Sequence, residues 1–170
     1  MTLSGTMLAV AAFAEQSAAI DLGVSRAPQS LSRQMQLASG TGAGKADRVF
    51  SDRRTLAASA SEDLDLAGAL LDAFGATITL ARVKGLIIAA ADGNTNSVVV
   101  GAASSNTWAT LLSSTGTVTL RPGAFVAVGT GLADAAGYAV TASTGDLLKI
   151  ANGGSGTSVT YDIHIIGCSA

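Results

Sequence analysis

The chain has 170 residues, of which 48% are hydrophobic and 13% are charged, and its formal net charge is −2. This length fits one domain with its own core, and no basic region is dense enough to bind nucleic acid. A single cysteine excludes an internal disulfide. Because the charged share is about half the usual value, much of the surface consists of small polar residues and alanine, which an assembly buries at low desolvation cost.

The first 29 residues are assigned to an N-terminal arm or a first strand. Their apolar stretch MLAVAAFA is too short to span a bilayer, so we expect no membrane insertion. It also has no basic residue before it, because the first is Arg26, and it is therefore expected to belong to the mature protein. The alanine-rich segment 7–20 is compatible with a helix or a strand, and Pro28 predicts a break after it.

Residues 30–170 are predicted to form one β-sandwich domain. From Leu31 onward the hydrophobic period is two, and in EDLDL the side chains of Leu64 and Leu66 are expected to point inward. The segment AGALLDAFG, bracketed by glycines, predicts a helical turn or a folded loop. In ATITLARVKGLIIAAA the hydrophobic phase slips, which predicts a bulge or bend between Arg82 and Gly85.

The second half of the chain contains short strand-like runs at regular spacing. ADGNTN is expected to be a hairpin loop leading into SVVVGA. The last run, SVTYDIHII, alternates most clearly, with Val159, Tyr161, Ile163 and Ile165 on the inward face. About nine or ten such strands indicate an all-β fold, an antiparallel β-sandwich of jelly-roll-like type with an N-terminal arm or extra strand.

No motif predicts catalysis, a cofactor or a metal site. His164 and Cys168 are the only histidine and cysteine, so too few ligands exist for zinc, and Cys168 is expected at the frayed end of the strand. GTGAGKAD is not a P-loop, because Ala46 stands where the hydroxyl residue belongs. DGNTN begins like an EF-hand loop, but Ser97 and Ala103 occupy its glycine and glutamate positions; an Asp-Gly hairpin is favoured over a weak calcium site.

Five charged residues lie close together in the sequence and are the candidate contact residues: Arg53, Arg54, Glu62, Asp63 and Asp65. Paired acids could suggest a glycosidase, but Trp108 is the only tryptophan available to line a sugar-binding cleft. We expect these charges to form salt bridges across a sheet or inter-subunit contacts.

Three stretches together resemble a family of small virion structural proteins of tailed bacteriophages. The first stretch begins with RVFSDRRTLAASASEDLDLAG, and the second is RPGAF. The third begins with GYAVTASTGDLLKIANG and ends in GTSVTYDIHIIG. The resemblance covers roughly residues 31–170, and TLAASASEDLDLAG and GTSVTYDIHIIG are its most specific segments. It implies a β-sandwich in the phage particle that is not an enzyme and that supplies no catalytic residues.

The expected function is that of a capsid decoration or cement protein. Such a protein would assemble in the host cytoplasm, bind the major capsid protein on the capsid surface and bridge neighbouring subunits as a homo-oligomer, a trimer or a pentamer. The first alternative is a vertex spike-base or tail-associated virion protein. The second is a carbohydrate-binding jelly-roll module, for which Trp108, Tyr138 and Tyr161 are the candidate stacking residues, although Tyr161 is expected to point inward.

Overall fold

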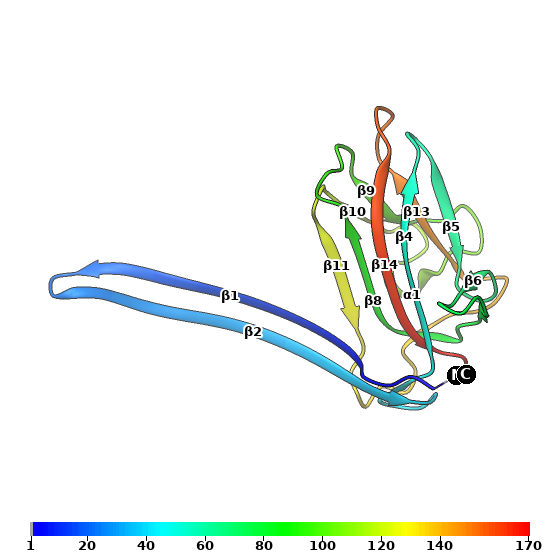
Figure 1. Cartoon of the computed structure of the whole chain (residues 1–170), viewed down its shortest axis with the longest axis horizontal. Helices are drawn as coiled ribbons and strands as arrows, with labels where there is room; N and C mark the ends of the chain where they lie inside the picture. Colours follow the sequence, from blue (N-terminus) through cyan, green and yellow to red (C-terminus); the bar gives the residue numbers. More distant parts are fainter. Residues whose placement is uncertain (1) are drawn as a thin grey trace.

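The computed structural model describes residues 2–170 and contains a β-rich body from which one long hairpin projects (Figure 1). Strands account for 56% of the chain and helix for 2%. The short helix α1, Ala109–Leu112, is the one α-helix among the described residues. The prediction of an all-β fold with antiparallel sheets, consistent with a β-sandwich, is confirmed.

Two antiparallel sheets form the body. The first, called here the β14 sheet, has the order β11-β8-β14-β4. The short strand β12 pairs with the same edge of β8 as β11 does. Its strands are β4 (Arg48–Leu56), β8 (Arg82–Ala90), β11 (Phe125–Gly129), β12 (Tyr138–Ala139) and β14 (Val159–Cys168). The second, called the β13 sheet, has the order β10-β9-β13-β5. Its strands are β5 (Ser61–Asp65), β9 (Val98–Gly101), β10 (Thr117–Leu120) and β13 (Leu147–Asn152). Two short strands, β6 (Leu70–Leu71) and β7 (Thr77–Ile78), pair separately.

Aliphatic side chains fill the space between the two sheets. The inward residues predicted for the last strand are all buried: Val159, Tyr161, Ile163 and Ile165. They pack in one cluster with inward residues of the β13 sheet such as Val98 and Ile150. Burying one such aliphatic side chain stabilises the folded state by about 1.5–3 kcal/mol. A core poor in aromatic residues is therefore sufficient for this domain.

A β-bulge lies where the sequence predicted one, between Arg82 and Gly85. Ile166 pairs with Gly85, but the next residue of β14, Gly167, pairs with Val83, so Lys84 is the extra residue. The Lys84 side chain is fully buried, and its Nζ donates a hydrogen bond to the main-chain carbonyl of Asp134. The bulge thus places a lysine under the 134–137 turn.

Two other expectations for the body are wrong. Residues 91–96 do not form a hairpin, because β8 and β9 belong to different sheets. Both edges of β8 are already paired, with β14 on one side and β11 and β12 on the other, so the chain must cross to the second sheet. The Asn94 side chain anchors this crossing loop through two hydrogen bonds of 2.8 Å to the main chain of Thr160. Cys168 is not at a frayed end; it is the last residue of β14 and is completely buried.

The N-terminal region forms a two-stranded ribbon, which we call the arm. Strand β1 (Thr6–Ile20) pairs with β2 (Gly23–Ser39) from Thr6↔Leu37 to Ile20↔Gly23, and a two-residue turn joins them. The helix alternative for this region is therefore wrong, and the boundary expected at residue 29 falls inside β2. Pro28 does not end the strand, because β2 is an edge strand of the ribbon at this point, where proline is tolerated.

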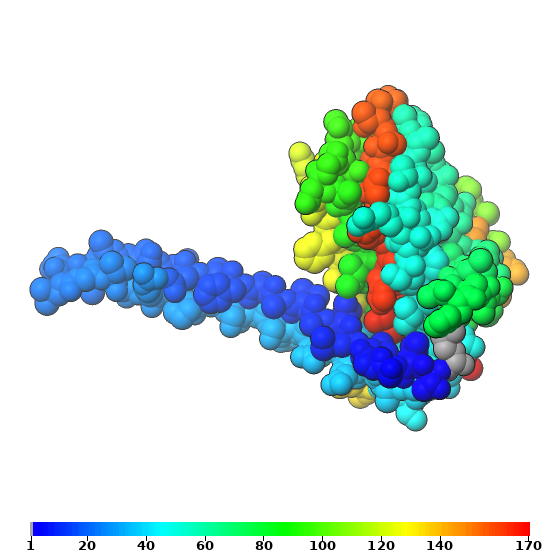
Figure 2. Space-filling view, viewed as in Figure 1, coloured from blue at the N-terminus to red at the C-terminus, as the bar shows by residue number. Residues whose placement is uncertain are grey.

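Only the root of the arm is packed against the body. Leu8, Met35 and Leu37 form a small second core with Ala46 and Ile166. The short strand β3 (Lys45–Ala46) also pairs with the end of β2. Residues 9–34 are all exposed. Figure 2 shows the arm as a thin extension that leaves the body near the end of the β14 sheet.

Candidate functional site

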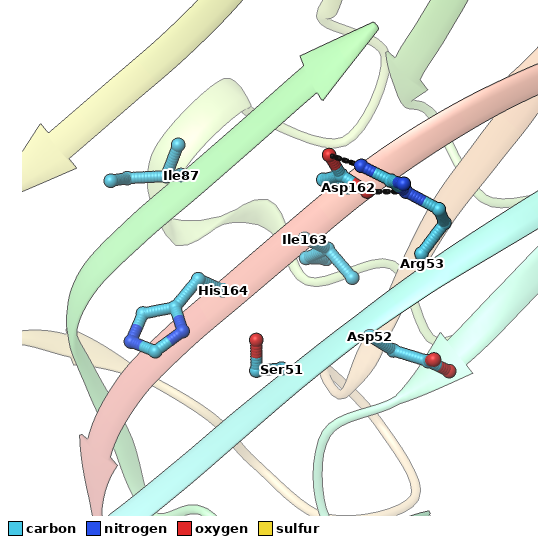
Figure 3. A pocket seen from close by; sticks show the side chains of 7 residues that line it. All are labelled: Ser51, Asp52, Arg53, Ile87, Asp162, Ile163 and His164. Carbon is cyan, nitrogen blue, oxygen red and sulfur yellow. Dashed lines mark hydrogen bonds and ion pairs between the residues drawn. The ribbon is translucent and has the colours of Figure 1, made fainter. Parts of the chain in front are cut away.

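One hollow lies on the outward face of the β14 sheet (Figure 3). It has a volume of about 600 Å³ and is open to solvent. Neighbouring strands β4, β8 and β14 supply its lining: Ser51, Asp52, Arg53, Ile87, Asp162, Ile163 and His164. Because side chains alternate along a strand, Arg53 and Ser51 share this face with Asp162 and His164 of the adjacent strand.

Arg53 and Asp162 form a bidentate ion pair across β4 and β14. Arg53 donates from Nε and a terminal nitrogen to the two carboxylate oxygens of Asp162, at 2.6 Å and 2.8 Å. These hydrogen bonds and the charge of Arg53 lower the pKa of the Asp162 carboxyl group. Both side chains remain largely exposed, so the pair contributes little to stability. Its effect is to keep two opposite charges fixed on one face of the sheet.

His164 lies in the same hollow and is half-buried. Burial lowers the pKa of its imidazole, which favours the neutral form. Among the hydrogen bonds of residues 2–170, none involves its side chain, whereas a general base is normally oriented by a partner. His164 is therefore a half-buried ring on the sheet surface, in the same hollow as the Arg53–Asp162 ion pair.

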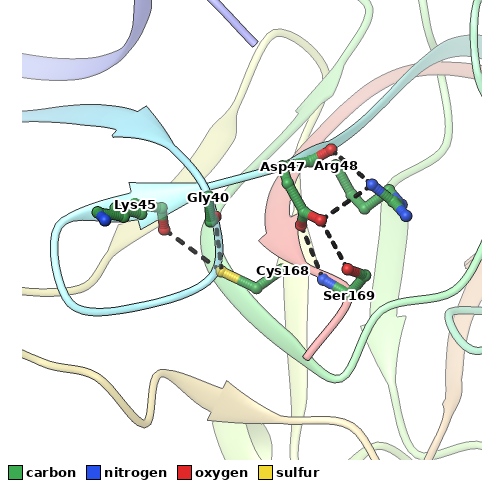
Figure 4. A network of polar contacts seen from close by, with 6 residues as sticks. All are labelled: Gly40, Lys45, Asp47, Arg48, Cys168 and Ser169. Atoms are coloured by element: carbon green, nitrogen blue, oxygen red, sulfur yellow. Dashed lines mark hydrogen bonds and ion pairs between the residues drawn. The ribbon is translucent and has the colours of Figure 1, made fainter. Parts of the chain in front are cut away.

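Cys168 lies four positions after His164 in an extended strand, which corresponds to about 13 Å. Its Sγ lies 3.3 Å from the carbonyl oxygen of Lys45 and 3.9 Å from that of Gly40 (Figure 4). Burial raises the pKa of this thiol, so the reactive thiolate is disfavoured. The two residues of the only His/Cys pair therefore cannot bind one ion together.

The network around Cys168 fixes the end of the chain. The carboxylate of Asp47 accepts hydrogen bonds from the main-chain N–H of Ser169 at 2.8 Å and from its hydroxyl at 2.6 Å. Arg48 adds an ion pair to the same carboxylate at 3.0 Å. Lys45 belongs to β3 and not to a phosphate-binding turn before a helix. Across residues 2–170, no group of three or more His, Cys, Asp or Glu residues could hold a metal ion.

Three of the five candidate contact residues form ion pairs within the chain. Arg53 pairs with Asp162, as described above. Arg54 forms ion pairs with Glu62 at 2.7 Å and with Asp52 at 2.9 Å. Glu62 also accepts a hydrogen bond of 2.8 Å from the buried Tyr161 hydroxyl, whose pKa is raised by burial and by this carboxylate. Because β4 and β5 belong to different sheets, this network joins the two sheets at one edge.

The other two candidate contact residues lie elsewhere on β5. Asp63 is exposed and pairs in register with Lys149 of β13. Asp65 accepts a hydrogen bond of 2.8 Å from the main-chain N–H of Ala67. Sequence reasoning missed the partners Asp52 and Asp162. The alternation of the last strand carried the signal for Asp162, since it predicted an outward side chain there.

The three aromatic residues considered for sugar stacking do not lie together on one exposed surface. Trp108 is buried and donates its indole N–H to the carbonyl of Ala139 at 2.8 Å. Tyr138 meets the Trp108 ring edge-on, with the ring centroids 6.4 Å apart. Tyr161 is also buried, as expected. The sequence candidates for sugar stacking are therefore used mainly inside the fold.

Most of the large apolar side chains that are exposed within residues 2–170 belong to the arm. Its exposed large side chains are Met7, Val10, Phe13, Ile20, Leu22, Val24 and Leu31. They lie on both faces of the ribbon, since Phe13 and Leu31 are one residue out of phase across the β1–β2 register. An isolated two-stranded hairpin is marginally stable in water. The arm is therefore the candidate functional surface.

Comparison of the chain with protein-family models, curated proteins and solved structures found no match. No helix within residues 2–170 has the length and apolar character needed to cross a membrane.

Proposed function

We propose that this protein is a structural component of a tailed bacteriophage virion, a decoration or cement protein of the capsid. In this role it binds the major capsid protein on the shell surface and bridges neighbouring shell subunits. The observation that carries the proposal is the arm: residues 9–34 are exposed, and large apolar side chains occur on both faces. The resemblance of residues 31–170 to small virion structural proteins gives the context.

The dimensions of the arm suit a bridging contact. Strand β1 has 15 residues, which corresponds to a reach of about 50 Å. Packing both apolar faces of such a ribbon against other subunits would bury surface that water now solvates, which favours association. A protein that binds only the assembled shell stabilises it by mass action. The arm thus provides a physical means of cementing a shell.

We also infer that the sandwich is a jelly roll. Numbering the eight strands of the two four-stranded paths in chain order gives the spatial orders 1-8-3-6 and 2-7-4-5, which support this reading. Jelly rolls are common in viral capsid proteins and in lectins, so the fold is compatible with the virion proposal and with the carbohydrate-binding alternative. The buried positions of Trp108 and Tyr161 favour the former.

The test is the resistance of phage heads to heating, with and without the added protein. A matched variant replaces residues 12–31 by Asn-Gly, which joins the paired residues Ala11 and Ser32 by a tight turn and keeps the packed root. We expect the full-length protein to raise the temperature at which heads open and the short-arm variant to raise it less. Heads that open at the same temperature with and without the full-length protein would contradict the proposal.

A further inference from the structure

The charges of the arm are few and unevenly used. Residues 6–39 contain four charged side chains: Glu15, Asp21, Arg26 and Arg33. Glu15 and Arg26 form an ion pair with each other across the ribbon. Within residues 2–170, Asp21 and Arg33 have no ion-pair partner, and Arg33 donates only to the carbonyl of Ser32 next to it, at 2.9 Å. The arm therefore presents one unpaired negative charge and one unpaired positive charge.

These two charges lie at opposite ends of the arm. Asp21 is in the turn at the tip, next to Leu22, whose side chain is 99% exposed. Arg33 is near the root, in register with Val10. β2 runs ten residues from Gly23, beside the turn, to Arg33, so Asp21 and Arg33 are about 35 Å apart. They cannot meet within one chain, but the same separation allows the tip of one molecule to meet the root of another.

The root contains a hollow that could receive an apolar tip. It has a volume of about 480 Å³ and lies between the start of the arm and the end of β11. Leu8 and Met35 are buried at this place, Leu132 at its border is 52% exposed, and Arg33 also lines it. On the body side, its lining includes Ala127 and Leu132. The hollow is therefore apolar with one unpaired positive charge beside it.

The length of the arm matches the size of the body. A compact unit of about 130 residues has a radius of gyration of about 14 Å and hence a diameter of about 36 Å. The projecting part of β1, residues 9–20, spans about 40 Å and therefore crosses the full width of an adjacent molecule. The tip of one copy can therefore reach the root of the next copy while the two bodies lie side by side.

We propose that the tip of the arm docks into the root hollow of a second copy of this chain. Leu22 enters the hollow against Leu8 and Leu132, and Asp21 pairs with Arg33 of the second copy. Around a two-fold axis the two arms lie antiparallel and both contacts form together; in a ring each arm reaches the next subunit. The inference rests on the proposed assembly role and specifies the partner of the arm.

The test is self-association of the full-length protein, measured by sedimentation velocity over a concentration range. We expect a dimer or a closed ring, and Leu22→Ser should weaken association about ten- to hundredfold, because a buried leucine contact is lost. Asp21→Arg and Arg33→Asp should each weaken it several-fold, and combining the two should restore it, since the charges are exchanged. Arg121→Asp, the same charge change at an exposed site on the body, is the control and should have no effect.

Two results would overturn the inference. One is a protein that is monomeric at every concentration. The other is association that is insensitive to Leu22→Ser, or that the charge exchange does not restore. The inference and the proposed function can fail separately: a monomer that binds phage heads contradicts only the tip-to-root contact, whereas a protein that self-associates but does not bind heads contradicts only the capsid role.

Discussion

Leu8 of the arm packs directly over Gly129 of β11. A Cβ atom at position 129 would lie 2.9 Å from Cδ2 of Leu8, closer than carbon atoms in contact normally approach. Met35 of β2 is similarly close to Gly85 of β8. A Cβ atom added at Gly85 would lie 3.2 Å from the Cε atom of Met35. Two glycines of the β14 sheet thus give the two strands of the arm a flat surface on which to pack.

Shortening Leu8 should loosen the root of the arm. Leu8→Ala removes a buried aliphatic side chain and leaves a cavity, so we expect the free energy of unfolding to fall by about 2–3 kcal/mol. Met7→Ala removes a side chain from the opposite, exposed face of the same strand and should change it by less than about 0.5 kcal/mol. Urea unfolding of both variants checks this. Equal losses would show that the root is not packed as described.

The hydroxyl of Tyr161 should contribute to closing one edge of the sandwich. Tyr161→Phe removes the hydrogen bond to Glu62, so we expect a loss of about 1 kcal/mol. Tyr138→Phe is the control, because the Tyr138 hydroxyl makes no hydrogen bond among residues 2–170. The two free energies of unfolding can be compared in urea. The network would be of no energetic importance if both variants were as stable as the wild-type protein.

His164 should make the stability depend on pH. Its folded-state pKa lies below the ordinary value of 6.5 because burial disfavours the charged form. The unfolded chain therefore binds a proton first as pH falls, and the contribution to stability is present above pH 6.5 and lost as pH falls through the folded-state pKa. When the pH is lowered from about 7.5 to about 5, the melting temperature of the His164→Gln variant should fall less than that of the wild-type protein. Parallel pH profiles would exclude this effect.

Gly167 should be one of the least replaceable residues of the fold. It follows the bulge, and a Cβ atom there would lie 2.4 Å from the carbonyl oxygen of Arg82. Because the main chain of Arg82 would have to move, Gly167→Ala should cost at least about 3 kcal/mol. Gly156→Ala is the matched control, since an added Cβ meets nothing within 4 Å there. Similar melting temperatures for the two variants would contradict the geometry.

The sequence predicted features that depend on local patterns. The alternation of residues 159–165 identified the buried face of β14, and the slip in hydrophobic phase located the bulge at Lys84. Both follow from the period of two along a strand. Of the five candidate contact residues, Arg53, Arg54 and Glu62 form ion pairs within the chain, and the role of all five in inter-subunit contacts stays a prediction.

Features that depend on distant partners were not predictable in the same way. Residues 91–96 have the composition of a hairpin loop, yet they cross between sheets because both edges of β8 are occupied. The alanine-rich segment 7–20 is a strand because β2 pairs with it along its whole length. Cys168 is buried because the 40–45 loop covers it, and nothing near it in the sequence indicates that cover.

The most direct test of the proposed capsid role is co-sedimentation of the purified full-length protein with mature phage heads and, separately, with isolated tails. We expect saturable binding to heads and none to tails, and the number of copies bound per shell distinguishes a cement protein from a vertex protein. Binding to tails alone, or to neither particle, would contradict a capsid decoration role.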